Sequence, residues 1–180
     1  MLYTRKGDKG NTYIFSCDQK MSKSSERAEA LGAVDEINSL LGLLKVKSEN
    51  FQFSIINSQL MNIIESIQQD LFIVQAILGG ADKVLTAERV AHMEGIVDAI
   101  EKEMPPIHSF FLAGGTELSV LCDYARAVAR RAERRVVALH EQDPLPAEVL
   151  RYLNRLSSLL YAVARWVNVK AGAGQKTPRY

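Results

Sequence analysis

Residues 117–141 read ELSVLCDYARAVARRAERRVVALHE, and the spacing of their apolar side chains decides the fold. On a wheel of about 100° per residue, one face of this segment is apolar along its whole length. That face consists of Leu118, Leu121, Ala125, Val128, Ala129, Ala132, Val136 and Leu139. Most of the stability of such a helix comes from covering its apolar face. The segment therefore predicts a long helix packed against other helices.

Apolar residues recur at helical spacing in four further stretches of the chain, at 25–47, 51–78, 86–103 and 147–170. Gly79 and Gly80 offer a C-cap to the second stretch, and Thr86 offers an N-cap to the third. Pro105 and Pro106 end the third stretch, because proline cannot supply the amide that a helix needs. The N-caps of the first stretch are offered by Ser22, Ser24 and Ser25.

Short connections join these segments, and no stretch alternates as a strand would. The sequence therefore predicts an all-α fold, an up-and-down helical bundle of about five helices. Neither an internal repeat nor a long linker divides the chain, so we expect a single domain over residues 1–180. Residues 1–24 form its N-terminal loop, and residues 171–180 are expected to be a flexible tail.

The composition favours a protein that handles a small ligand. Of 180 residues, 47% are apolar and 24% are charged, with a net charge of +1. This charge provides no overall field for nucleic acid or an anionic membrane. Polar residues interrupt every apolar run before the roughly 20 residues of a membrane span. Cys17 and Cys122 form no CxxC pair and the opening residues lack a signal peptide's apolar core, so we expect a cytoplasmic protein without membrane or nucleic-acid partners.

The arginines of 117–141 fall into two groups. Arg126, Arg130 and Glu133 lie together at the margin of the apolar face, whereas Arg131 and Arg135 point well away from them. A charge at the core margin needs a partner, since an unpaired buried guanidinium costs several kcal/mol. Asp35, or a bound polyphosphate, could serve as that partner. A purely structural network of ion pairs is the alternative interpretation, and nucleic-acid binding is disfavoured by the absence of interleaved aromatic residues.

Residues 4–12 read TRKGDKGNT and place two glycines, three cations and two hydroxyls before the first helix. Such a loop can wrap phosphates with its backbone amides, and a flexible charged terminus is the alternative. Residues 172–177, GAGQKT, look like a fragment of a P-loop. The glycine spacing is wrong and no helix can follow, so this tail segment is set aside as a nucleotide site.

Several other chemistries lack their motifs. None of the three histidines follows a glutamate at the spacing of a di-iron site, and the two cysteines are too far apart in sequence to suggest zinc. No GxSxG nucleophile elbow occurs. No residue is therefore assigned as a metal ligand.

Taken together, four segments resemble the PduO-type ATP:cob(I)alamin adenosyltransferases. They are TRKGDKGNT at 4–12, EALGAVDEINSLLG at 29–42, FFLAGGTELSVLCDYARAVARRAERRV at 110–136 and RYLNRLSSLLYAVARW at 151–166. The resemblance implies an enzyme that transfers the 5′-deoxyadenosyl group of ATP to the cobalt of cob(I)alamin, releasing triphosphate. It also implies a homotrimer with ATP at each subunit interface, where the N-terminal loop of one chain closes over a neighbour's arginine helix.

The resemblance also implies the residues of the nucleotide site. Around the triphosphate it places the N-terminal residues Thr4, Arg5, Lys6, Gly7, Asp8, Gly10 and Thr12, together with Lys23. From the last two helices it adds Arg130, Arg131, Glu133, Arg134 and Asn154. Arg130 is expected to be catalytic, with Mg²⁺ accompanying the phosphates.

On the corrinoid side, the resemblance implies that Asp35 and Arg126 form an interhelical ion pair and that Phe110 displaces the lower base of the corrinoid. A cob(I)alamin nucleophile needs no catalytic His or Cys, which agrees with the lack of such a dyad. A transient corrinoid reductase or a B12-dependent enzyme is an expected partner. The alternative is a sensor or delivery protein that binds ATP or corrinoid without turnover.

Five positions depart from the family's pattern, namely Lys6, Ser24, Ser25, Ala113 and Ser158. We expect these departures to alter the affinity for the metal or the corrinoid more than the reaction itself.

Overall fold

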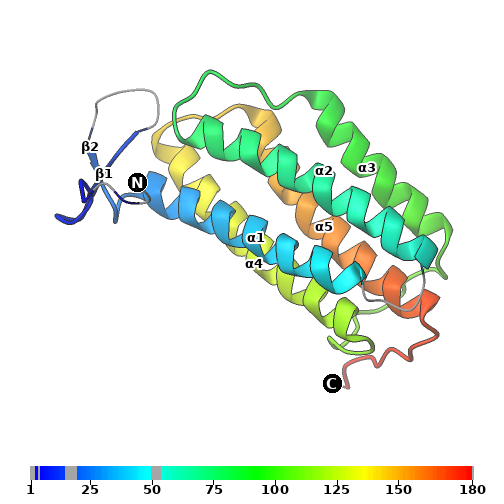
Figure 1. The fold of residues 1–180 in the computed structure, drawn as a ribbon. Coiled ribbons are helices and arrows are strands. Elements are labelled where there is room, and N and C mark those ends of the chain that lie inside the picture. Colours follow the sequence, from blue (N-terminus) through cyan, green and yellow to red (C-terminus); the bar gives the residue numbers. More distant parts are fainter. Residues whose placement is uncertain (1–2, 4, 15–19, 50–53, 180) are drawn as a thin grey trace.

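The computed structural model describes residues 3, 5–14, 20–49 and 54–179. Within this part, five long helices form an antiparallel bundle, and a small hairpin lies beyond one end of it (Figure 1). The helices are α1 (Glu26–Glu49), α2 (Ser54–Leu78), α3 (Ala87–Lys102), α4 (Glu117–Gln142) and α5 (Ala147–Lys170). The predicted all-α bundle of about five helices is thus confirmed. Residues 51–53, the start of the second predicted helix, lie outside the described residues.

The predicted helix ends follow local capping. The Ser25 hydroxyl accepts a hydrogen bond from the Ala28 amide at 3.3 Å, so it caps α1. Gly80 lies in the left-handed region at φ 83°, and it lets the chain turn after α2 as expected of a C-cap. Thr86 occupies the N-cap position of α3 but makes no side-chain cap. Its hydroxyl instead bonds Glu88, which lowers the pKa of that carboxyl.

The sequence did not predict the hairpin. Strands β1 (Asn11–Tyr13) and β2 (Lys20–Ser22) pair antiparallel, with Thr12 opposite Met21. Each strand has only 3 residues and none of their side chains is buried, so the strands lack the buried face that marks a strand in sequence. The hairpin fixes the N-terminal segment just before α1 (Figure 1).

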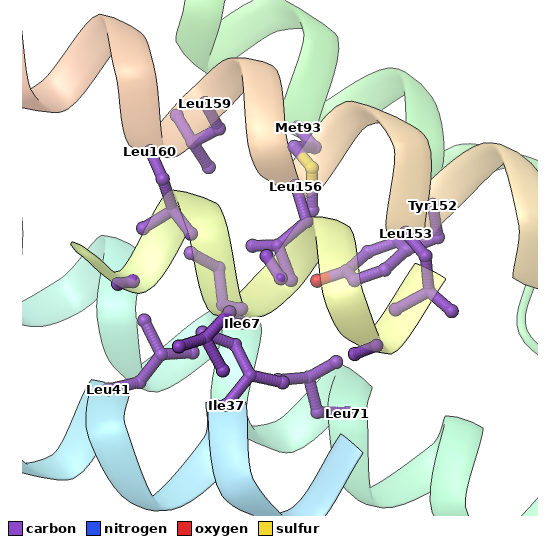
Figure 2. Close-up of a cluster of buried hydrophobic side chains, with 14 of the residues drawn as sticks. Ile37, Leu41, Ile67, Leu71, Met93, Tyr152, Leu153, Leu156, Leu159 and Leu160 are labelled. Atoms are coloured by element: carbon purple, nitrogen blue, oxygen red, sulfur yellow. The ribbon is translucent and has the colours of Figure 1, made fainter. Parts of the chain in front are cut away.

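In the bundle, α1 packs between its antiparallel neighbours α2 and α4, and α5 packs between α4, which is antiparallel to it, and α3, which runs in the same direction. Figure 2 shows the centre of the core, where leucine and isoleucine side chains from α1, α2 and α5 meet Met93 of α3. The carboxylate of Asp70 is buried in this core. The Tyr152 hydroxyl donates to Asp70 Oδ2 at 2.9 Å, and Arg89 pairs with the other carboxylate oxygen. The Asp70 charge is therefore satisfied although only 3% of the residue is exposed.

Replacing Leu156 by alanine should destabilise the bundle by about 2–5 kcal/mol, because the side chain is fully buried and its removal leaves a cavity. Urea unfolding followed by circular dichroism measures the loss. Val84→Ala, at a side chain that is 72% exposed, is the control and should change stability by less than about 0.5 kcal/mol. A Leu156→Ala loss no larger than that of the control would contradict the packing described here.

Candidate functional site

A cleft of about 730 Å³ opens between α3, α4, α5 and the α3–α4 loop, residues 103–116. It contains three of the predicted site residues, namely Phe110, Arg126 and Arg130. The other polar or aromatic side chains along it are Glu101, Phe111, Asp123, Tyr124, Ser157, Ser158 and Tyr161. The cleft thus connects apolar side chains of the α3–α4 loop to one side of α4. That side carries Arg126, Arg130 and, one turn further on, Arg134, and is called the arginine face below.

The arginines of the cleft are available to an anion. Arg126 is half-buried, its guanidinium lies 5.9 Å from the centre of the Tyr161 ring, and its Nε has no hydrogen-bond partner among the described residues. Arg130 and Arg134 are exposed, and neither forms an ion pair with another described residue. Positive charge without an internal partner is typical of a site for phosphate groups.

Beside these arginines, the structure brings together two further predicted residues. Asn154 Nδ2 of α5 donates to Glu133 Oε1 of α4 at 2.8 Å. Arg155 Nη1 donates to the amide oxygen of Asn154 at 2.8 Å, and its Nε donates to Glu94 at 2.7 Å. Glu133 and Asn154 are therefore held in one orientation at the edge of the arginine face.

Arg131 and Arg135 form the second arginine group that the helical wheel predicts. Both reach α1, where Arg131 pairs with Glu36 and Arg135 lies 3.8 Å from Glu29. The hydrogen bond from Arg131 to Glu36 raises the pKa of the Arg131 guanidinium. Within one chain, Arg131 is therefore engaged by a carboxylate and lies away from the cleft.

The predicted Asp35–Arg126 ion pair is not formed among the described residues. Asp35 is exposed on α1 and accepts a weak hydrogen bond from Gln75 Nε2 of α2 at 3.4 Å. Arg126 lines the cleft between α4 and α5 instead. The reason is geometric, since consecutive residues of a helix point about 100° apart. Glu36 faces α4, and Asp35 consequently turns toward α2.

The N-terminal loop folds around Lys23. A Cβ at Gly7 would lie 2.9 Å from Lys23 Nζ, and the Lys23 amide donates to the Gly10 carbonyl at 2.9 Å. Gly10 has φ 77°, a conformation that favours glycine. The structure thus groups Gly7, Gly10 and Lys23, with Thr12 following in β1. Lys6 and Asp8 are exposed in the same loop, Arg5 lies over the Tyr3 ring, and Thr4 is outside the described residues.

The predicted nucleotide site has two halves, the N-terminal loop and the arginines of α4. The described ion pairs of α4 go to α1 and α5, and Figure 1 shows the hairpin extending past the end of the bundle where α1 begins. A single subunit therefore presents a basic loop at one end and an arginine-lined cleft along its side.

Sequence reasoning missed Asp123, Tyr161, Arg165 and Asn168. Arg165 was detectable, because it is the one cation inside the apolar run from Leu159 to Val167. A charge in such a run is either buried with a partner or functional. Asp123, Tyr161 and Asn168 carried no comparable signal, since none of them is a lone charge within an apolar run.

Two buried groups near the site have shifted pKa values. Burial raises the pKa of the Cys122 thiol, the neighbouring Asp123 charge raises it further, and Arg165 partly opposes both. Burial also raises the pKa of the Tyr152 phenol, with Asp70 adding to the effect. Both groups therefore stay protonated at neutral pH, and neither is suited to act as a nucleophile or base.

Two features are absent from the part of the chain that the structure describes. None of its helices combines the length and the hydropathy of a membrane span. No three His, Cys, Asp or Glu side chains there gather in a way that could hold a metal ion.

Known proteins are similar to this chain in sequence and in fold. The family model described as "Cobalamin adenosyltransferase" matches residues 2–167. A corrinoid adenosyltransferase of Bacillus subtilis is 39% identical over 178 residues, with 96% of this chain and 89% of that protein covered. Corrinoid adenosyltransferase PduO of Citrobacter freundii is 36% identical over 171 residues, and the match covers 91% of this chain but about half, 49%, of that longer protein.

Two solved structures are also similar to this chain in fold. A phenylalanine-to-histidine variant of a PduO-type ATP:corrinoid adenosyltransferase from Lactobacillus reuteri, complexed with cobalamin and ATP, superposes with a TM-score of 0.90. It is 32% identical, and the match covers 99% of this chain and 97% of that chain. An arginine-to-lysine variant from the same organism, complexed with ATP, gives a TM-score of 0.89 at 31% identity, covering 99% and 100% of the two chains. Given the matched sequence, the shared bundle and the arginine-lined cleft, this chain belongs to the cobalamin adenosyltransferase family.

Proposed function

We propose that this chain transfers the 5′-deoxyadenosyl group of ATP to the cobalt of a reduced corrinoid. The observation that carries the proposal is the cleft in which Phe110, Arg126 and Arg130 meet. In the reaction, the cob(I) electron pair forms a cobalt–carbon bond to the 5′ carbon. The bond from that carbon to oxygen breaks, and its electron pair leaves with the triphosphate.

The protein's tasks are to position the substrates and to stabilise the leaving group. Arg130 neutralises charge that develops on the triphosphate, and Arg134 extends the same positive face. Glu133 and Asn154, held together at 2.8 Å, orient the nucleotide beside them. Phe110 covers the corrinoid end of the cleft, where an apolar ring displaces the lower base and excludes water.

The N-terminal loop suits the phosphates of ATP, and the cleft suits the corrinoid. Lys23 above Gly7, with the amides around Gly10, offers a cationic cradle suited to phosphates. Mg²⁺ would be carried mainly by the phosphates of ATP, as is usual for this ion in nucleotide sites. Asp35 and Arg126 remain proposed residues of the corrinoid side, although they are not paired within one chain.

We further propose a homotrimer in which the N-terminal loop of one subunit completes the cleft of its neighbour. The position of the hairpin, which extends past the end of the bundle in Figure 1, supports this arrangement. It would bring Arg5, Lys6, Asp8 and Thr12, together with Thr4, close to Arg130 and Arg131 of another subunit. We expect the assembly to work in the cytoplasm, where a corrinoid reductase or a B12-dependent enzyme would meet it transiently.

Anaerobic turnover tests the activity. Purified protein is mixed with MgATP and chemically reduced cobalamin, and the absorbance change on cobalt–carbon bond formation is followed. Adenosylcobalamin and an equimolar amount of triphosphate are the expected products. Tight binding of ATP and cobalamin without product would overturn the transferase proposal and favour a sensor or delivery protein.

A further inference from the structure

Arg165 of α5 is buried behind the cleft, with only 1% of its side chain exposed. Its Nη2 pairs with Asp123 of α4, and its Nη1 donates to Gln175 Oε1 of the C-terminal tail at 2.9 Å. Its guanidinium also lies 5.7 Å from the ring centre of Phe111 and 5.2 Å from that of Tyr161. One side chain therefore contacts α4, the α3–α4 loop and the tail at once.

Three of these partners, Asp123, Phe111 and Tyr161, line the cleft, whereas Arg165 itself does not. Phe111 precedes the turn into α4 and follows Phe110, which is 77% exposed at the cleft. An exposed ring without packing partners would sample several rotamers. Holding the neighbouring Phe111 against a buried guanidinium restricts the backbone that carries Phe110.

The same end of α5 fixes the rest of the loop. The Leu112 amide donates to the Lys176 carbonyl at 2.8 Å, and Asn168 Nδ2 donates to the Gly114 carbonyl at 2.9 Å. Gly115 has φ 97°, and a Cβ there would lie 2.3 Å from Asn168 Oδ1. Loop, tail and helix end are thus closely fitted, with Arg165 at their centre.

We propose that Arg165 is a positioning residue of the reaction, which sets the affinity for the corrinoid by fixing Phe111 and Asp123 in the wall of the cleft. This inference rests on the proposed function, since it takes the Phe110 side of the cleft as the corrinoid site. Arginine suits this role better than lysine. Its planar fork reaches Asp123 and Gln175 together and presents a flat face to both rings.

Arg165→Lys is the first test, because lysine keeps the charge opposite Asp123 but loses the fork. We expect the KM for reduced cobalamin to rise about tenfold or more, and the KM for ATP to stay within about twofold. Electron paramagnetic resonance of cob(II)alamin on the ATP-loaded protein supplies a readout besides activity. The fraction of bound corrinoid that lacks its lower base should fall. Equal changes in both KM values, or no change in a folded variant, would overturn the proposal.

Gln175→Ala keeps the test decisive if Arg165→Lys does not fold, because it removes only the tail contact. It should raise the KM for cobalamin by about threefold to tenfold, in the same direction and again without changing that for ATP. Arg151→Lys, at a 64% exposed arginine of the same helix, is the matched control and should change neither. An unchanged cobalamin KM in Gln175→Ala would count against the inference. Absence of turnover in the wild type would instead refute the proposed function, while cob(II)alamin binding would still decide the role of Arg165.

Discussion

Arg130→Ala is expected to lower kcat for adenosylcobalamin formation by roughly 10²–10³-fold, the loss seen when one preorganised charge-stabilising donor is removed. Arg130 lines the cleft, is exposed and has no ion-pair partner among the described residues. Its charge is therefore free to meet the departing triphosphate. Little stability should be lost, because no internal contact is broken. Anaerobic stopped-flow absorbance with saturating MgATP and reduced cobalamin measures kcat directly.

Two further variants are needed to interpret the result for Arg130→Ala. Arg130→Lys keeps the charge but loses the bidentate fork, so it should retain more activity than the alanine variant. Arg151→Ala removes an arginine from the exposed start of α5 and should leave kcat within about twofold. If Arg130→Ala and Arg151→Ala had the same kcat, the arginine face would be structural and the leaving-group role would be wrong.

Phe110→Ala is expected to cut the rate by on the order of 10²-fold when the reaction starts from cob(II)alamin with a mild reductant. The ring is 77% exposed, so its loss should cost little folding free energy. The kinetic effect should be large because, without the ring, the lower base can stay on the cobalt, and the corrinoid is then harder to reduce.

The starting oxidation state of the cobalt distinguishes an effect of Phe110 on the lower base from an effect on packing alone. With cobalamin already reduced chemically, Phe110→Ala should lose much less activity, since the reduction step is bypassed. Leu112→Ala is the matched control, because that side chain is 53% exposed in the same loop but does not line the cleft. A loss of equal size from both oxidation states would refute the proposed effect of Phe110 on the lower base.

The bundle was predictable because its signal is local. Helical periodicity and caps such as Ser25 and Gly80 depend on residues a few positions apart, and the structure confirms them. The division of the α4 arginines was predictable for the same reason, since the wheel alone separates Arg130 from Arg131. The hairpin at residues 11–22 was not, because its strands are short and lack a buried face.

The partners of the site residues could be predicted less well than their positions. Asp35 and Arg126 illustrate this, because within one chain Asp35 accepts a hydrogen bond from Gln75 of α2 while Arg126 lines the cleft. Arg165, which the sequence analysis missed, shows the complementary case, because its place within an apolar run is a signal of burial but not of the segments it contacts. Such contacts depend on how helices distant in sequence rotate against one another, and no single segment encodes that.

The order of the helices has a consequence for how the protein folds. Most of the cleft is built from α4 and α5, which are consecutive in the chain and joined by residues 143–146 alone. Closing so short a connection costs little chain entropy, so this helical hairpin should form early in the folding transition state. The contact of α1 with α4 spans far more chain and should form later. The arginine face would then exist in rudimentary form before the rest of the bundle, with φ-values higher on α4 and α5 than on α2.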